Sequence, residues 1–140
     1  MAARGCDLAF TAPTELRVEG GLPGGGKDSV IVRVASIVPF LVMKGMALSD
    51  RLKEKDPWDI YYCVRHFPGA IDALSEEFHP YMRHGLVREG MEKIAAAFAS
   101  VEHVGPVSVA DFEEVTDPED RALLCRDAFE RVSLLLGKAI

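Results

Sequence analysis

This sequence has only three cysteines, no long apolar run and no excess of positive charge. The three cysteines, Cys6, Cys63 and Cys125, are odd in number and form no CxxC pair, so we expect reduced structural thiols rather than a disulfide framework. The apolar runs near Ile37–Met43 and Leu134–Leu136 are far too short to span a bilayer, and the N-terminus lacks a signal-peptide profile. These absences favour a cytoplasmic protein with no membrane partner.

The charge balance excludes a generally basic surface. The net charge is −6 and the isoelectric point is near 5.2, so any contact with nucleic acid must rest on a local patch. The four histidines match no common ligand spacing, so surface or capping roles are expected and no metal site is predicted: His66, His79, His84 and His103. With 140 residues, 49% of them hydrophobic, the chain can bury one core, and a single domain over residues 1–140 is predicted.

Residues 7–36 have the pattern of a short antiparallel β-hairpin. A first strand is expected from Asp7–Phe10, and in the segment ELRVE the apolar Leu16 and Val18 alternate with charged residues. The segment SVIVRVAS alternates in the same way, with its apolar positions at Val30, Val32 and Val34. The intervening GGLPGGGKD is typical of a flexible hairpin turn.

This loop also resembles a phosphate-binding P-loop, because Gly21, Gly26 and Lys27 satisfy most of the pattern G-x-x-x-x-G-K-[ST]. The next residue, however, is Asp28, whose carboxylate would repel phosphate. A strand pattern follows it, whereas the motif requires the N-terminus of a helix. We therefore interpret the loop as a turn and reject the P-loop.

Residues 37–140 have the apolar spacing of a helical bundle. Three amphipathic stripes recur at helical spacing: Ile71, Leu74 and Phe78; Val87, Met91, Ile94 and Phe98; and Cys125, Phe129, Val132 and Leu136. Gly105-Pro106 indicates a turn between the last two stripes. The acidic run Asp111–Asp120 indicates a charged loop and a helix start. Because these stripes must bury one another, the predicted class is α+β, mostly α, with the bundle packed against the hairpin.

One stretch, Val38–Tyr62, contains residues that call for a chemical explanation. Lys44 interrupts an apolar run within an expected helix Phe40–Lys55, and a buried ammonium requires an acidic partner, a phosphate or a route to water. Steps of about 100° per residue place Lys44 in a basic stripe with Leu48, Arg51 and Lys55.

The segment Asp56-Pro57-Trp58-Asp59 is typical of a new helix start. Asp56 is expected at the N-cap, Pro57 at the first helical position and Asp59 in the first turn. Lys44 and the two carboxylates are therefore expected at one corner of the fold. A purely structural alternative stays open, because Asp117-Pro118-Glu119-Asp120 repeats the D-P-x-D pattern without an upstream lysine in an apolar run.

The same stretch carries a family resemblance. The pattern K-x-x-A-L-x-D-R-x-K-x-[KR]-D-x-x-D is met without gaps, and its charged positions include Lys44, Asp50, Arg51, Lys55, Asp56 and Asp59. The sequence thereby resembles the C-terminal half of AbiEii/AbiGii-type toxin nucleotidyltransferases, which belong to the DNA polymerase β-like nucleotidyltransferase superfamily. The resemblance implies that Lys44 contacts nucleotide phosphate and that Asp56 holds the catalytic corner. Asp59, Arg51 and Lys55 follow as supporting catalytic and nucleotide-binding residues.

A departure from the family concerns its metal-binding motif. A Gly-Ser followed by Asp-x-Asp should precede the lysine, and nothing before Val38 supplies it. Nucleotidyl transfer needs carboxylates that hold Mg²⁺ against the triphosphate. The resemblance implies Mg²⁺ and a nucleoside triphosphate as cofactor and substrate, but this chain is expected to be incomplete as an enzyme.

Three hypotheses follow from the sequence. The leading one is a toxin-type nucleotidyltransferase that moves a nucleoside monophosphate from NTP to an acceptor, with tRNA implied by the resemblance. The second is a non-catalytic remnant or helical domain that binds a partner such as an antitoxin. The third is a structural ion pair between the lysine and the aspartates.

The aromatic residues Trp58, Tyr61 and Tyr62 are more typical of a core than of base stacking.

Overall fold

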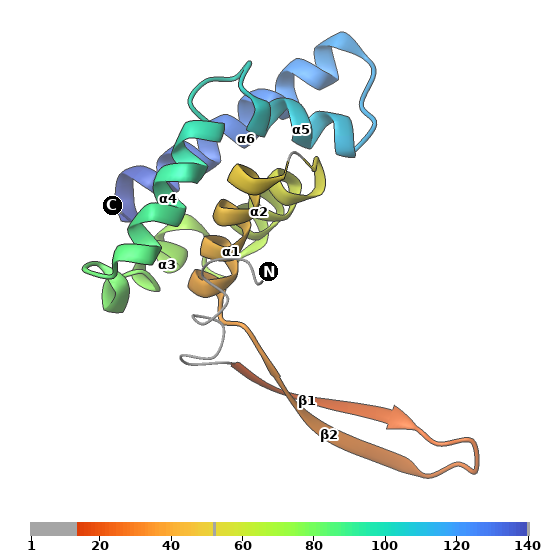
Figure 1. The fold of residues 1–140 in the computed structure, drawn as a ribbon. Helices are drawn as coiled ribbons and strands as arrows, with labels where there is room; N and C mark the ends of the chain where they lie inside the picture. The colour runs from red at the N-terminus through yellow and green to blue at the C-terminus, as the bar shows by residue number, and fades with distance from the viewer. Residues whose placement is uncertain (1–13, 52, 140) are drawn as a thin grey trace.

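The computed structural model describes residues 14–51 and 53–139, and Figure 1 shows a β-hairpin that leads into a bundle of helices. The predicted class, α+β and mostly α, is confirmed. The elements in chain order are β1 Thr14–Gly21, β2 Lys27–Val34, α1 Ile37–Asp50, α2 Lys55–His66, α3 Ala70–Glu76, the 3₁₀-helix η2 His79–Tyr81, α4 Gly85–Ala97, α5 Val104–Phe112 and α6 Pro118–Ala139. The strand expected over Asp7–Phe10 lies outside the described residues.

The hairpin has the predicted antiparallel pairing. Leu16 lies opposite Val32 and Val18 opposite Val30 in the register of the two strands. The loop closes through a hydrogen bond from the Leu22 N–H to the Gly26 carbonyl at 2.6 Å. A strand and not a helix follows this loop, so it lacks the helix N-terminus that a P-loop requires.

The hairpin does not pack against the bundle as the sequence pattern predicted. Figure 1 shows β1 and β2 extending away from the helices, which pack among themselves. An isolated two-stranded ribbon buries little apolar surface, so the stability of the described fold resides in the helical part.

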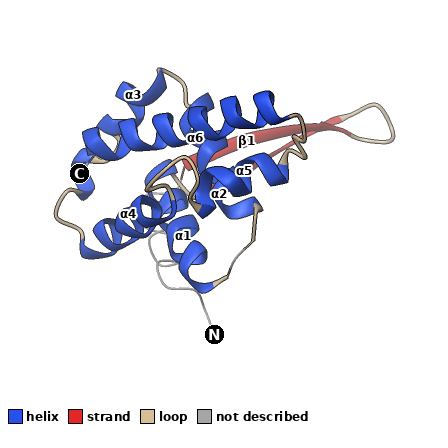
Figure 2. Ribbon diagram, turned by 90° about the horizontal axis from the view of Figure 1, so that it is seen from above, coloured by secondary structure: helices blue, strands red, loops and turns tan. Residues whose placement is uncertain are grey.

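Helices α1 and α4 approach each other at two glycines (Figure 2). A Cβ atom built on Gly45 would collide with the Gly90 carbonyl oxygen, and one built on Gly90 would lie 2.9 Å from a Val42 methyl carbon. The absence of two side chains thus allows close contact of the two backbones. This contact holds α1, which carries Lys44, firmly in the bundle.

The predicted stripe of α4 is confirmed, because Val87, Met91, Ile94 and Phe98 are all buried. In the last helix the prediction is partly wrong. Its buried face consists of Cys125, Ala128, Val132 and Leu135, whereas Phe129 and Leu136 are only half buried.

The turn predicted at Gly105-Pro106 is wrong, since both residues lie in the first turn of α5. Proline is tolerated there because the first N–H groups of a helix have no intrahelical acceptor. Gly105 is buried, and a Cβ atom at this position would lie 2.6 Å from the Phe98 ring. Tertiary packing against α4 therefore decides the role of this dipeptide.

In the described residues, Cys63 and Cys125 are free thiols, and Cys6 lies outside them. Burial raises the pKa of both thiols, so they are expected to remain protonated and unreactive at neutral pH. No helix within residues 14–51 and 53–139 is long and apolar enough to cross a membrane.

Candidate functional site

The boundary between α1 and α2 differs from the prediction. The helix expected to continue to Lys55 ends at Asp50, and Arg51 has an extended backbone with φ −148° and ψ 139°. Arg51 and Lys55 therefore do not belong to one helical stripe with Lys44, although the fold brings all three together.

The sequence predicted Asp56 at the N-cap of α2, and this prediction is wrong. Asp56 lies within the first turn of that helix. The helix begins earlier because the Asp56 N–H donates to the Lys53 carbonyl and the Trp58 N–H to the Glu54 carbonyl. The Asp56 carboxylate is thereby released from capping and points toward Lys44 of α1 and toward Arg51, which follows α1.

Lys44 lies between the two carboxylates of α2. Its Nζ atom is 3.2 Å from Asp56 Oδ1 and 2.7 Å from Asp59 Oδ2. Arg51 donates to both oxygens of Asp56, from Nε at 2.9 Å and from Nη2 at 3.0 Å, in the bidentate geometry that guanidinium groups favour. Lys55 Nζ lies 2.8 and 2.9 Å from the two oxygens of Asp59.

These five residues, Lys44, Arg51, Lys55, Asp56 and Asp59, form what we call the ion-pair cluster. Three cations meet two carboxylates, so the cluster carries one surplus positive charge. All the residues that the sequence singled out for catalysis or nucleotide binding thus meet at one place.

Burial is uneven within the cluster. Asp56 is 1% exposed and Asp59 8%, whereas the side chains of Arg51 and Lys55 are 50% and 61% exposed. Burial alone would raise the pKa of Asp56, but hydrogen bonds from Arg51 and Lys44 outweigh it and hold that pKa below its usual range. Burial alone would lower the pKa of Lys44, but hydrogen bonds to Asp59 and Asp56 raise it above its ordinary value. Both groups are therefore charged at neutral pH.

The second D-P-x-D segment provides an internal comparison. Asp117 accepts a hydrogen bond from the Asp120 N–H at 3.1 Å, which is the ordinary role of an aspartate that precedes a helix. Asp56 makes ion pairs instead. The same four-residue pattern thus has two outcomes, and the presence of Lys44 and Arg51 distinguishes them.

The carboxylates of the cluster do not fit a magnesium ion. Both oxygens of Asp56 and both of Asp59 already accept hydrogen bonds from lysine or arginine. Mg²⁺ needs free oxygen ligands in octahedral geometry and would be repelled by three adjacent cations. In the part of the chain that the structure describes, no group of three or more acidic, histidine or cysteine side chains is arranged to hold a metal ion.

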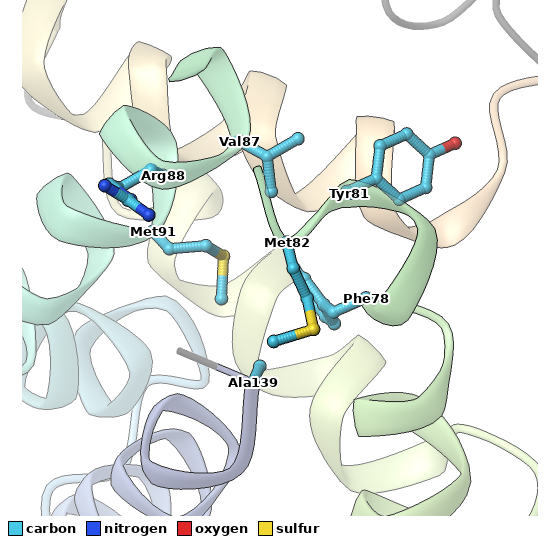
Figure 3. A pocket seen from close by; sticks show the side chains of 7 residues that line it. All are labelled: Phe78, Tyr81, Met82, Val87, Arg88, Met91 and Ala139. Atoms are coloured by element: carbon cyan, nitrogen blue, oxygen red, sulfur yellow. The ribbon is translucent and has the colours of Figure 1, made fainter. Parts of the chain in front are cut away.

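An anion fits this place better. A surface hollow of about 220 Å³ is lined by Met43, Lys44, Ala47, Asp50 and Arg51, so two of the three cluster cations face it together with the carboxylate of Asp50. A smaller and mainly apolar pocket of about 130 Å³ lies elsewhere in the bundle, between η2, α4 and the end of α6 (Figure 3). That pocket shares no residue with the cluster.

Sequence reasoning missed a row of aromatic rings beside the cluster. The ring centroids of Trp58 and Tyr62 are 5.1 Å apart, those of Tyr62 and His66 4.5 Å, and Phe112 of α5 lies 4.8 Å from Trp58. We call these four residues the aromatic row. The spacing of residues 58, 62 and 66 along one helix was the available signal, but Phe112 was not predicted to be helical.

Tyr61 is buried as predicted, and its hydroxyl connects α2 to α6. It donates to Asp127 Oδ2 at 2.5 Å and accepts from Arg65 at 2.9 Å. Burial and the hydrogen bond to Asp127 raise the pKa of Tyr61 to about 12. Tyr62 contradicts the expectation of a core residue, because it is 49% exposed.

Comparison with protein-family models, with curated proteins and with solved structures finds no match to this chain.

Proposed function

We propose that this chain supplies the phosphate-binding corner of a toxin-type nucleotidyltransferase. Such an enzyme transfers a nucleoside monophosphate from NTP to an acceptor, for which the sequence resemblance suggests tRNA, in the cytoplasm. The observation that supports the proposal is the meeting of the five predicted residues in one cluster with a surplus cation. A triphosphate is the substrate group whose charge this surplus would complement.

Lys44 is suited to bind phosphate because the cluster does not depend on it alone. If Lys44 turned toward a phosphate, Asp56 would keep its bidentate contact with Arg51 and Asp59 its contact with Lys55. Neither buried carboxylate would then be left without a cation. Asp56 and Asp59 would act as positioning residues that hold Lys44 at the edge of the hollow.

Catalysis would need metal-binding carboxylates from outside the cluster. Mg²⁺, when bound, neutralises the charge that develops on the transferred phosphoryl group. The residues described here would orient the triphosphate through Lys44, Arg51 and Lys55. The chain by itself is therefore proposed to bind NTP and not to complete the transfer.

Calorimetric titration with each of the four common NTPs tests this proposal. Lys44→Met should weaken the binding of the preferred NTP at least about tenfold, as expected for the loss of one charged phosphate contact. Lys138→Met is the matched control, because Lys138 pairs with Asp72 at the surface and shares no partner with the cluster. If none of the NTPs binds the wild-type chain, or if both variants bind equally well, the proposal is wrong.

A second candidate function is a non-catalytic domain that binds a partner protein such as an antitoxin. The projecting hairpin favours it, because in residues 14–34 the structure describes a two-stranded ribbon, and an edge strand of such a ribbon can accept a further strand from a partner. Co-purification with the product of a neighbouring gene tests this candidate. Ile31→Glu alters an exposed hairpin residue and should abolish the capture, whereas Leu134→Glu in α6 should not.

A further inference from the structure

The hollow beside the ion-pair cluster has two chemically different sides. Lys44 and Arg51 supply cations to it, and its other lining residues are Met43, Ala47 and Asp50. With steps of about 100° per residue, these last three residues fall within one sector of roughly 60° on α1. Two apolar side chains and one carboxylate therefore form a row next to the cations.

Helix stability does not explain the position of Asp50. Asp50 is the last residue of α1, and a carboxylate at the C-terminal end of a helix opposes the helix dipole. The residue is exposed, and within residues 14–51 and 53–139 no ion pair or hydrogen bond engages its carboxylate. Arg51 follows it directly in the chain but pairs with Asp56 instead. A charged residue that breaks a local stability rule in this way is typical of a functional site.

The charges of the hollow select a ligand with an anionic part and a separate part that donates hydrogen bonds. Phosphate oxygens would lie toward Lys44 and Arg51 and away from Asp50, which repels them. A carboxylate only accepts hydrogen bonds, so Asp50 suits neutral donors such as hydroxyl groups. In a nucleotide the ribose carries such hydroxyls and is attached directly to the phosphates, whereas the amino groups of the base lie beyond the sugar.

We propose that Asp50 binds the ribose hydroxyl groups of the nucleoside triphosphate and makes this site selective for ribonucleotides. This inference rests on the proposed function, because it concerns the sugar of the ligand whose phosphates Lys44 and Arg51 hold. Met43 and Ala47 would contact the carbon atoms of the sugar. A 2′-deoxynucleotide lacks one hydroxyl donor, so less of the repulsion between Asp50 and the phosphates would be offset.

Calorimetric titration of the full chain with paired nucleotides tests this selectivity. ATP, GTP, CTP and UTP are each compared with the corresponding 2′-deoxynucleotide. We expect the wild type to bind its preferred ribonucleotide about tenfold more tightly than the deoxy counterpart, as for a hydrogen bond to a charged group. Asp50→Ala should bind the two equally, and should bind the deoxynucleotide at least as tightly as the wild type does, because the repulsion is gone. Asp72→Ala is the matched control and should keep the wild-type ratio, since Asp72 contacts Lys138 on the surface.

Equal affinity of the wild type for the ribonucleotide and its deoxy counterpart would overturn this inference and leave the proposed function standing. An unchanged ratio in Asp50→Ala would also overturn it, even if both affinities changed together, because Asp50 would then act only through its charge on the phosphates. If no nucleoside triphosphate binds the wild type, both proposals are wrong. Lys44→Met should weaken the ribonucleotide and the deoxynucleotide by the same factor, which separates the phosphate contact from the sugar contact.

Discussion

Lys44 and Asp59 form an ion pair of 2.7 Å that fastens α1 to α2. The same ammonium reaches Asp56 at 3.2 Å, so one lysine serves two buried carboxylates. Each of these carboxylates also has a second cation, Arg51 for Asp56 and Lys55 for Asp59. This duplication sets the expected response of the site to substitution.

The first prediction concerns removal of the two cations of Asp56. Lys44→Met should lower the free energy of unfolding by only about 1 kcal/mol, because Arg51 remains, and Arg51→Ala should lower it only slightly, because Lys44 remains. The double variant leaves Asp56, which is 1% exposed, without a partner and should lose about 3–5 kcal/mol. Urea unfolding of the wild type, the two single variants and the double variant measures the coupling energy between Lys44 and Arg51 in this double-mutant cycle.

The pair Lys44→Met and Lys138→Met is the control for that cycle, since Lys138 contacts Asp72 on α3 and should behave additively. Additive losses for Lys44 and Arg51 would show that the two cations do not share Asp56. A loss of 3–5 kcal/mol for Lys44→Met alone, in the range of a broken buried pair, would favour the purely structural interpretation of the cluster.

The second prediction concerns stability in acid. The folded-state pKa of Asp56 lies below its ordinary value of 3.8, so its contribution is present above that value and is lost as pH falls through the folded-state pKa. The unfolding free energy of the wild type should therefore drop below about pH 4, and Asp56→Asn should drop less. Asp127 also has a lowered pKa, so part of the acid loss should persist in this variant. Identical acid profiles would contradict the prediction.

The third prediction concerns stability in alkali. Tyr61 has its pKa raised from 10.0 to about 12 in the folded protein, so the folded state holds the proton more tightly. Its contribution is complete below pH 10 and should be lost between pH 10 and pH 12. Tyr61→Phe should show a shallower loss over this window in unfolding experiments. Tyr81→Phe, a change at a tyrosine in η2, serves as the control and should follow the wild type.

The fourth prediction concerns the glycine contact between α1 and α4. Gly45→Ala should destabilise the fold by about 1–3 kcal/mol, because the new methyl group collides with the Gly90 carbonyl. Gly137→Ala is the opposite control, since nothing lies within 4 Å of its Cβ position in α6. That change should stabilise the protein by roughly 0.5–1 kcal/mol through helix propensity. Thermal unfolding should show shifts of opposite sign.

Much of the architecture could be predicted from local patterns. Alternation of apolar residues located the hairpin, and the spacing of Val87, Met91, Ile94 and Phe98 located the buried face of α4. Helix α5 was missed because Gly105 and Pro106 suggest a turn when only neighbouring residues are considered. Its helical state depends on the packing of Gly105 against Phe98, a contact that no local pattern contains.

The sequence by itself determined which side chains are available for the cluster. Lys44 in an apolar run calls for an acidic partner, a phosphate or a route to water, and Asp56 and Asp59 follow the helix that the sequence predicted to end at Lys55. Only the tertiary structure decided that all five groups saturate one another, that Asp56 is no cap, and that the rings of Trp58 and Tyr62 meet Phe112 at the surface. The physical reason is that ion pairs and ring contacts depend on distances between separate helices, and packing alone sets those distances.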